Sequence, residues 1–586
     1  MRNRLLLCII AFAAATAQAQ HKSFSKLTPE SGLMLQGHAR GVALADYDND
    51  GLLDIYIAQE KKGNALFKNL GDLQFENVTE SAGLDELLKN HRVGVWADYD
   101  NDGFADLFVA GTEAYRIYRN TGDGAFENAT ESADLFNRER IHAAMWGDVN
   151  NDGFIDLYTA NFNEKNTLFR NEKNGAFVNG TTPSGIRDPY SAAMGGAFGD
   201  YDNDGDLDLY LVHDANQPFR LFRNSGYGYF TDVSRQAGVD LEAMGMGTVF
   251  ADFDNDGWLD IYITNLHPNA IFFNNQNGSF ANTTESSGVG DVGMGWGTVA
   301  FDYDNDGLLD IFVANGSRFH HPPHDNVLYR NLGDRKFENV TLPAGLSSLR
   351  DGWCAAAGDL NNDGFQDLIL TNWNDEFVEV FVNNGNENNY LKVSLDGATC
   401  NRYAIGARVR IVSDGDEQIR ELSGGSGFLS QDSPVLHFGL NQRTMIDTLQ
   451  VFWPGAGAET LTNVETNQTV HVVEGSPTSV ETLENAPPQS LVLHPNYPNP
   501  FSTLKQTPGT TFRFELAQPG SIELAVFDVT GRQVYKLSEN ALAAGVHELL
   551  WNGQTFENRP SGSGVYFVRL KSGNRQRLQK ITILNK

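Results

Sequence analysis

The chain contains the stretch Asp46-Tyr-Asp48-Asn-Asp50-Gly51-Leu52-Leu53-Asp54, and six further copies of this acidic loop follow it. The later copies begin at Asp98, Asp148, Asp200, Asp252, Asp302 and Asp359, so successive copies lie 52, 50, 52, 52, 50 and 57 residues apart. A repeat of about fifty residues predicts one supersecondary unit per copy.

The acidic side chains alternate along each loop, so they can converge on one point together with the backbone carbonyl of the seventh residue. Calcium accepts six to eight oxygen ligands in irregular geometry, whereas magnesium demands a strict octahedron. The glycine at the sixth position, such as Gly51, permits the positive φ that the reversal needs. We therefore predict up to seven Ca2+ sites. The predicted ligands are Asp46, Asp48, Asp50, Leu52 and Asp54; Asp98, Asp100, Asp102, Phe104 and Asp106; Asp148, Asn150, Asp152, Phe154 and Asp156; Asp200, Asp202, Asp204, Asp206 and Asp208; Asp252, Asp254, Asp256, Trp258 and Asp260; Asp302, Asp304, Asp306, Leu308 and Asp310; and Asp359, Asn361, Asp363, Phe365 and Asp367.

The loops differ from EF-hands, which need an acid at the twelfth position. Those positions are apolar or Thr here, as at Ile57 and Val109, and the flanking segments read as strands. Asn150 and Asn361 replace the third aspartate in two copies and lower the ligand charge there. The alternative of seven metal-free turns would crowd carboxylates together without a counter-ion.

The composition limits the partners and the compartment. The formal net charge is -32, and 27 aspartates lie in the seven loops, so nucleic acid is not an expected partner. Residues 1–19 combine Arg2 and Arg4 with an apolar run and a small-residue cleavage site, which predicts a signal peptide. No later segment is long and apolar enough for a transmembrane helix in the mature chain. Cys354 and Cys400 fall in different predicted domains, which argues against a disulfide between them.

Each repeat contains four strand-like segments. A small-residue segment such as Gly41–Asp46 enters the loop, an alternating segment leaves it, a third ends in an Asn-rich turn, and a fourth reads like Gln74–Leu84. This pattern predicts an all-β fold with a seven-bladed β-propeller over residues 20–389. The last repeat lacks its fourth strand and Phe24–Leu33 is an unpaired one, so we expect the N-terminal strand to close the ring. A linear solenoid is the alternative, but its two ends would not need to share one set of four strands in this way.

The remaining sequence predicts two further domains. Residues 390–475 read as a small Gly-rich β domain, and residues 476–490 read as a Pro-containing linker. Residues 491–586 read as a strand-rich C-terminal domain, an Ig-like β-sandwich.

Three resemblances to known families accompany these patterns. The D-x-D-x-D-G-x-x-D loops resemble the FG-GAP or VCBS repeats of integrin-type propellers, in which the loop binds calcium. Residues 390–475 resemble the ASPIC/UnbV domain through Asn401–Ala407, Gly424–Gln431 and Val451–Gly455, although Cys400 replaces an expected Ser. Residues 491–586 are similar to the type A C-terminal sorting domain of the type IX secretion system, through Tyr497–Phe501 and Phe527–Arg532. This resemblance implies the type IX secretion machinery as a partner and secretion or outer-membrane surface display in a Bacteroidota-like bacterium.

Catalytic motifs do not stand out in the sequence. Neither a G-x-S-x-G elbow nor a P-loop lysine occurs, and Ser426 in its Gly-rich run has no base nearby. The segments that connect strands and blades on the propeller face opposite the loops contain amide, cationic and aromatic side chains. Such side chains suit a glycan or an acidic group as ligand. Alternatively, these residues bond to neighbouring blades and water. The predicted ligand-binding residues are His91, Arg92, His142, Tyr190, His213, His267 and Trp373.

The favoured function is a calcium-stabilised adhesion or binding module for a glycan or extracellular protein ligand, without catalysis. The alternative is an extracellular calcium-dependent polysaccharide-degrading enzyme of lyase type, in which His91, Arg92, His142 or Tyr190 would act as base or charge neutraliser. A third possibility is a structural spacer. The group His320, His321 and His324 reads as an exposed insertion or, alternatively, a transition-metal site.

Overall fold

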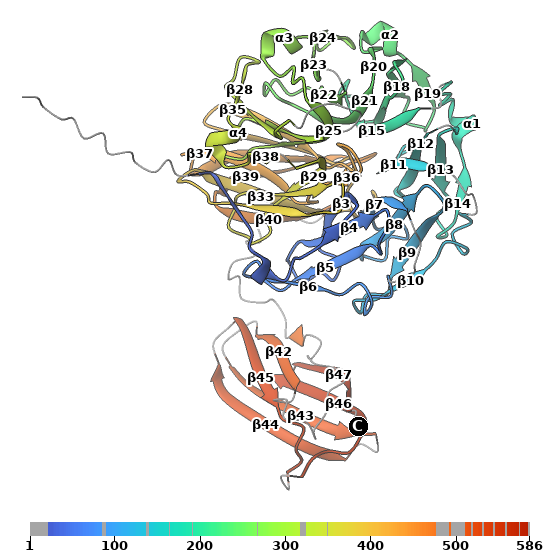
Figure 1. Cartoon of the computed structure of the whole chain (residues 1–586). Coiled ribbons are helices and arrows are strands. Elements are labelled where there is room, and N and C mark those ends of the chain that lie inside the picture. The colour runs from blue at the N-terminus through green and yellow to red at the C-terminus, as the bar shows by residue number, and fades with distance from the viewer. Residues whose placement is uncertain are drawn as a thin grey trace, which may run out of the picture. The chain divides into compact units, whose positions relative to one another are not determined.

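The structure is a computed structural model of the chain (Figure 1). It describes residues 22–84, 90–135, 140–162, 164–189, 192–266, 268–316, 324–348, 350–475, 492–493, 510–516, 520–529, 532–542, 545–556, 559–572 and 575–583. The chain divides into two compact units, Met1–Val480 and Glu481–Lys586. Among the described residues, no helix is both long and apolar enough to cross a membrane.

The first unit contains a repeated antiparallel sheet, found seven times among the described residues. The sheets are β3 (Ala39–Ala45), β4 (Asp54–Gln59), β5 (Ala65–Asn69) and β6 (Phe75–Asn77); β7 (His91–Ala97), β8 (Asp106–Gly111), β9 (Tyr115–Asn120) and β10 (Phe126–Asn128); β11 (Ile141–Gly147), β12 (Asp156–Asn161), β13 (Thr167–Asn171) and β14 (Phe177–Asn179); β15 (Ala193–Gly199), β16 (Asp208–His213), β18 (Arg220–Asn224) and β19 (Phe230–Asp232); β21 (Gly245–Ala251), β22 (Asp260–Asn265), β23 (Ala270–Asn274) and β24 (Phe280–Asn282); β25 (Met294–Phe301), β26 (Asp310–Gly316), β27 (Val327–Asn331) and β28 (Phe337–Asn339); and β29 (Gly352–Gly358), β30 (Asp367–Asn372), β32 (Glu379–Asn383) and β1 (Phe24–Lys26). Two-stranded pairs join β2 (Gln36–Gly37) to β31 (Glu376–Phe377) and β17 (Gln217–Pro218) to β20 (Glu242–Ala243).

The sheets lie around a common centre (Figure 1), with the first strands β3, β7, β11 and β15 inside and the last strands β6, β10, β14 and β19 at the rim. This is a β-propeller-like, all-β architecture. The inner strands are built from small residues because the centre is crowded. A Cβ on Gly195, for example, would lie 2.4 Å from the carbonyl oxygen of Met246 on the next sheet.

The N-terminal strand completes the last sheet, as the sequence predicts. β1 pairs with β32 in antiparallel register, with Phe24 opposite Asn383 and Lys26 opposite Phe381. The two ends of the repeat array are therefore tied together by backbone hydrogen bonds, and the sheet edge that β32 would otherwise expose is covered.

The fourth strand of each repeat is shorter than the sequence analysis expects. β6 ends at Asn77 instead of continuing to Leu84, and β1 ends at Lys26 before the 3-10 helix η1 (Pro29–Ser31). The side chain of Asn77 accepts the N–H of Thr79, and the Thr79 hydroxyl accepts the N–H of Leu66. Such side-chain bonds compete with the strand ladder and turn the chain away. In four repeats a one-turn helix follows: α1 (Thr181–Ser184), α2 (Ser234–Ala237), α3 (Thr284–Ser287) and α4 (Thr341–Ala344).

Asparagine side chains connect neighbouring sheets at two positions of the repeat. The last residue of each third strand sends its Nδ2 to a carbonyl of the preceding sheet, as Asn274 does to Tyr201 at 2.8 Å, and to a carbonyl of its own sheet. The same bond joins Asn69 to Leu360, across the first and last repeats. The fourth loop residue also bonds forward, as Asn49 does to the Gly103 carbonyl at 3.1 Å. The contacts between sheets therefore run through buried or part-buried amides as well as apolar side chains.

The segment after the repeats forms two sheets with a shared apolar core, built around residues such as Phe438 and Trp453. One sheet has the order β37 (Leu436–Asn441), β33 (Asn389–Asp396), β40 (Gln468–Val473), and the other has the order β35 (Asp416–Glu421), β34 (Arg408–Ser413), β38 (Met445–Phe452), β39 (Ala458–Glu465). We refer to residues 389–475 as the lid segment, because its side chains contact the acidic loops.

The loop of residues 423–433 extends from the lid segment into the centre of the ring. β36 (Ser430–Gln431) pairs in parallel with β3, which makes that sheet five-stranded. Gly427 exchanges two backbone hydrogen bonds with Thr248, at 2.8 and 2.9 Å. The side chain of Gln431 bonds to both the N–H and the carbonyl of Trp96. Residues from three different sheets thus contact this loop, which we call the central plug.

Glycines let the central plug fit between the inner strands. A Cβ on Gly424 would lie 2.3 Å from the Trp146 carbonyl oxygen, and one on Gly427 would lie 2.6 Å from the Thr298 carbonyl oxygen. Gly427 also has a φ of 65°, which disfavours a β-branched residue. The Gly-rich run that contains Ser426 is therefore an insertion loop.

The second unit contains two sheets, β41 (Val492–Leu493), β42 (Thr510–Leu516), β45 (Gly545–Trp551) and β44 (Gln533–Leu542), β43 (Gly520–Asp528), β46 (Gly564–Ser572), β47 (Arg575–Ile583). Their buried residues, including Phe514 and Trp551, form one apolar cluster. The Ig-like assignment stays a prediction. Tyr497–Phe501 and the linker 476–490 lie outside the described residues. Cys354 and Cys400 are both free and buried.

Replacement of Asn274 by Ala removes three side-chain hydrogen bonds and leaves two buried carbonyls without their amide donor. We expect a destabilisation of about 2 to 4 kcal/mol, seen as a lower apparent melting temperature by calorimetry. The control Asn277→Ala alters an exposed amide in the same turn and is expected to change the melting temperature little. Equal effects of the two substitutions would contradict the role of Asn274.

Replacement of Gly424 by Val is expected to expel the central plug, because its side chain would overlap the Trp146 carbonyl. The readout is limited proteolysis, in which the 389–475 segment should become cleavable while the repeats stay protected. Gly457→Val is the matched control, since a Cβ at Gly457 meets nothing within 4 Å. Unchanged proteolysis of the Gly424 variant would argue against the insertion.

Candidate functional site

The first aspartate of every acidic loop is held by the loop backbone. Its Oδ1 accepts the N–H of the fifth residue and its Oδ2 accepts the N–H of the glycine, as Asp98 does from Asp102 at 2.9 Å and Gly103 at 2.7 Å. All seven copies have this pair of bonds. The first position therefore shapes the loop in addition to supplying a ligand oxygen.

The ninth aspartate is also bonded to backbone donors. Asp54 accepts the N–H of Asn69 at 2.8 Å with Oδ1 and the N–H of Tyr47 at 3.2 Å with Oδ2, and it is fully buried. Burial raises the pKa of Asp54 to about 8. In each repeat this residue thus ties the loop to its third strand, a structural role that the sequence analysis does not anticipate.

The third position carries oxygens that the protein itself does not satisfy. Among the described residues, one buried side-chain oxygen has no hydrogen-bond partner in each of five loops, at Asp48, Asn150, Asp202, Asp254 and Asp304. A buried carboxylate oxygen without a partner is costly unless a cation compensates it. These oxygens are the atoms that a metal ion would engage.

Carboxylate oxygens converge within 4.8 Å of one another in five loops. The clusters are Asp46, Asp48 and Asp50; Asp98, Asp100 and Asp106; Asp200, Asp202 and Asp208; Asp252, Asp254 and Asp260; and Asp302, Asp304 and Asp306. No three-acid cluster occurs in the described loops that carry Asn150 and Asn361. The repeated clusters can hold metal ions, and their all-oxygen donor set fits a hard cation.

Basic side chains lie beside several clusters. Arg119 bonds to Asp100 at 2.8 Å, Arg335 bonds to Asp254 at 2.6 Å, and Lys68 contacts Asp48 and Asp50. From the lid segment, Lys392 bonds to Asp359 at 2.7 Å and Arg408 donates to the Asp200 carbonyl. These contacts partly offset the acidic charge and anchor the lid segment to the loops.

Burial is the main cause of the raised pKa values of the first aspartate in these loops. It raises the pKa of Asp46 to about 6, that of Asp98 and Asp252 to about 7, and that of Asp302 to about 8, with neighbouring carboxylates adding to the effect. Bound metal favours the ionised form and competes with protons for the same oxygens.

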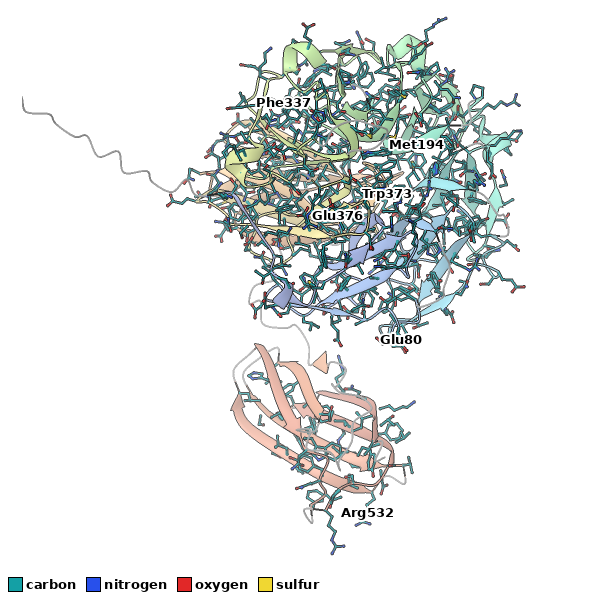
Figure 2. All side chains as sticks on the ribbon, in the orientation of Figure 1. Glu80, Met194, Phe337, Trp373, Glu376 and Arg532 are labelled. Atoms are coloured by element: carbon teal, nitrogen blue, oxygen red, sulfur yellow. The ribbon has the colours of Figure 1, made fainter. Side chains whose placement is uncertain are left out.

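A cavity of about 140 Å³ lies at the ends of the inner strands that are opposite the acidic loops. It is lined by Arg40, Arg92, His142, Phe162, Met194, Asp214, Met246, Leu266, Trp296, Trp353, Phe428 and Leu429. Figure 2 places Met194 and Trp373 toward the middle of the ring of sheets, while Glu80 lies at its edge. Of the seven predicted ligand residues, Arg92 and His142 line the cavity and contact each other.

Of the other predicted ligand residues, the three that the structure describes do not line the cavity. Trp373 stacks on Arg40, whose guanidinium carbon is 3.2 Å from the ring centre. His213 is buried and paired with Asp188 at 2.8 Å, and His91 is buried and bonded to Asn64. Tyr190, His267, His320 and His321 lie outside the described residues. Among the described residues of the lyase alternative, the structure brings Arg92 and His142 together.

The seven predicted ligand residues leave out most of the cavity wall. Arg40, Met194, Met246, Trp296 and Trp353 each stand six residues before the first aspartate of a loop, as do Arg92 and His142. This shared register is visible in the sequence. Phe428 and Leu429 come from the central plug, and no local pattern links them to the repeats.

Comparison with protein families confirms two of the resemblances. The FG-GAP-like repeat family matches residues 46–109, 98–159, 148–211, 200–263, 252–313 and 302–370, which together cover more than half of the chain. The chain belongs to the FG-GAP-like repeat family. The family described as ASPIC and UnbV matches residues 397–479, within and just beyond the lid segment.

The relatives include cartilage acidic protein 1 of two mammals. The Mus musculus protein is 27% identical over 491 residues, covering 77% of this chain and 67% of that protein. The Homo sapiens protein is 25% identical over 490 residues, covering 77% of this chain and 65% of that protein. The FG-GAP repeat chain thus spans about two thirds of the length of these relatives.

Solved structures give weaker likenesses. An Agrocybe aegerita lectin that recognises non-reducing terminal N-acetylglucosamine matches with a TM-score of 0.34 and 18% identity, over 54% of this chain and 79% of that chain. BBS1N in complex with ARL6DN matches with a TM-score of 0.38 and 12% identity, over 62% and 97%. Both TM-scores are low, so neither likeness supports an inference about this FG-GAP repeat chain.

The raised pKa values predict an unusual pH dependence for the metal-free protein. Since the folded-state pKa values lie above the ordinary 3.8, protonation favours the folded state, and this stability is lost as pH rises through about 6 to 8. After EDTA treatment, we expect the apparent melting temperature to rise when the pH is lowered from 8 to 6. Saturating calcium should flatten or reverse this trend. A melting temperature of the EDTA-treated protein that rises with pH would contradict the assignment.

Proposed function

We propose that the chain is a calcium-clamped, seven-bladed propeller that works outside the cell as a binding module for glycans or proteins. The third-position oxygens carry this proposal, because they are buried, unpartnered among the described residues and adjacent to further carboxylates in four of the five loops. An FG-GAP-like repeat chain with this donor set suits a divalent cation in every such loop.

Calcium fits the loops better than magnesium does. The ligands are carboxylates from positions one, three and five or nine, and the donor set therefore differs between clusters. Calcium tolerates such irregular coordination, whereas magnesium needs a near-ideal octahedron and keeps its waters. The Asn150 and Asn361 loops would bind calcium more weakly because each lacks one charged ligand.

The binding role rests on the cavity opposite the loops. The central plug occupies the middle of the ring and supplies Phe428 and Leu429 to the cavity wall. The cavity is largely apolar with a few convergent polar groups, which is the usual character of a ligand site. A scaffold held by metal ions on one face would keep this cavity in shape on the other.

We also propose that residues 1–19 and 491–586 serve in export. In this proposal the first is removed as a signal peptide, and the second is recognised by type IX secretion machinery at the outer membrane of a Bacteroidota-like bacterium. The support is the sequence resemblance alone. Intact mass measurement of the exported protein tests it, since a mature protein that still carries residues 491–586 would contradict removal of the tail.

Calcium addition is expected to raise the apparent melting temperature strongly, and magnesium is expected to act less. Each site that binds only the folded state contributes about 2.7 kcal/mol at a calcium concentration of 100 times Kd. Asp254→Asn should reduce the calcium-dependent shift, because it makes the fifth loop resemble the third. Asp72→Asn, an exposed residue outside the loops, is the control. A melting curve that calcium and EDTA leave unchanged would contradict the calcium clamp.

The binding role is tested separately with the calcium-loaded full chain. It is applied to an array of glycans and used to capture extracellular proteins from the producing organism. We expect at least one ligand that is retained by the chain and lost after Phe428→Ala. Binding of nothing on the array and nothing in the capture would contradict the binding role while leaving the calcium clamp in place.

A further inference from the structure

One position of the repeat supplies seven of the residues that line the cavity and holds four residue types. The residue six before each acidic loop is Arg40, Arg92, His142, Met194, Met246, Trp296 and Trp353 in the seven repeats, and all seven line the cavity. The next position along the same strands holds only small residues or Val: Gly41, Val93, Ala143, Gly195, Gly247, Gly297 and Cys354. The scaffold thus repeats, while the chemistry of the cavity wall does not.

This variation gives the cavity two chemically distinct arcs. Sheets one to three contribute the cationic and polar residues Arg40, Arg92 and His142, whereas sheets four to seven contribute methionines and tryptophans. A site of this kind suits a ligand that is charged at one end and apolar on one face.

The two arginines of the cationic arc bond to the same acidic residue. Arg40 and Arg92 both contact the carboxylate of Glu60, at 2.5 and 3.1 Å. Burial alone would raise the pKa of Glu60, but the two guanidinium groups outweigh it and lower the pKa, so Glu60 is ionised. Arg92 donates to Glu60 and to His142, and its planar guanidinium group has a further donor, Nε, that suits an anion.

The same arc holds hydrogen-bond donors that have no acceptor among the described residues. Arg92 can only donate, so its contact with His142 makes His142 Nε2 the acceptor and places the imidazole proton on Nδ1. Burial and the neighbouring Arg92 lower the pKa of His142 to about 3, so the ring stays neutral. His142 Nδ1 and Arg92 Nε are both buried without a partner. These two unpartnered donors lie beside guanidinium groups, so a negatively charged group with several hydrogen-bond acceptors would satisfy them.

The apolar arc is a cluster of aromatic rings packed against one another, with Trp353 stacked between Trp296 and Trp373. The rings of Trp296 and Trp353 stack with centroids 3.8 Å apart, and Phe428 of the central plug packs against both at 5.5 and 5.7 Å. Trp296, Trp353 and Phe428 line the cavity and give it an apolar side that suits the C–H groups of a sugar ring. Asp214, from the fourth sheet, adds a carboxylate that can accept hydroxyl donors.

We propose that this cavity binds the carboxylate-bearing terminal sugar of an acidic glycan, a uronic acid residue. The carboxylate would face Arg92 and His142, the C–H face would lie on the tryptophan wall, and hydroxyl groups would donate to Asp214. A cavity of about 140 Å³ has room for one ring instead of a chain, so recognition is of an end group. This inference rests on the proposed binding function and names its ligand class.

An acidic peptide is the competing occupant. A Glu or Asp side chain would satisfy the cationic arc, but it has no apolar face for the tryptophan wall and no hydroxyl donors for Asp214. The cavity therefore favours the sugar acid over the amino acid.

The test uses the calcium-loaded full chain and isothermal titration calorimetry, with tryptophan fluorescence as a second readout because Trp296 and Trp353 line the site. The probes are glucuronate and galacturonate, the uncharged sugar glucose, which has CH2OH where glucuronate has a carboxylate, and a Glu-containing peptide. We expect either uronate to bind at least tenfold more tightly than glucose or the peptide and to change the fluorescence. Arg92→Gln should weaken uronate binding at least tenfold, and Asp214→Asn should weaken it several-fold.

Arg235→Gln is the matched control, since that side chain is 95% exposed on α2, away from the cavity lining. It should leave uronate binding unchanged. Arg92→Gln must also keep the calcium-dependent melting shift, which shows that the variant is folded.

Equal binding of glucose and uronate, tighter binding of the peptide, or an unaffected but folded Arg92→Gln variant would each overturn the inference. If neither uronate binds but the array or the capture identifies another ligand, the uronic acid inference is overturned and the proposed binding function stands. If no probe binds and neither the array nor the capture identifies a ligand, the proposed binding function is overturned as well.

Discussion

The fold depends on buried carboxylates that need backbone N–H donors. In each repeat the first and ninth aspartates accept four N–H bonds between them, as Asp98 and Asp106 do. An unpaired carboxylate at such depth would be costly, so the loop can adopt only the conformation that supplies these donors. Because the donors come from the loop and from the third strand, one residue type fixes both the turn and the sheet behind it.

The same loops connect the sheets to one another. The fourth residue of the loop, such as Asn49, lies at positive φ and reaches a carbonyl of the next repeat. Asn362 makes the same bond to Gly51, so the last repeat meets the first. A metal ion engaging the third-position oxygens would therefore stabilise a ring and not only a turn. The cavity on the opposite face gains its fixed shape from this network.

The lid segment and its central plug link the two faces. Basic residues such as Lys392 contact the acidic loops, and Gly424 and Gly427 bring the plug against inner strands. The plug then contributes Phe428 to the cavity, which the repeats alone would leave without that wall. Comparison of the seven repeats shows one place where function is free to vary, because the position six before each loop carries chemically different side chains.

The sequence by itself determined the repeat, the acidic loops, the all-β class and the pairing of the N-terminal strand with the last repeat. These features follow from local spacing, since turns, alternation and strand count are written within about fifty residues. The tertiary structure alone decided which residues share the cavity and that the plug enters the ring. It also separated His213 and His91, which bond to Asp188 and Asn64, from Arg92 and His142, which line the cavity. Such contacts join residues that are hundreds of positions apart, and a buried histidine satisfied by its neighbour looks the same in sequence as one that awaits a ligand.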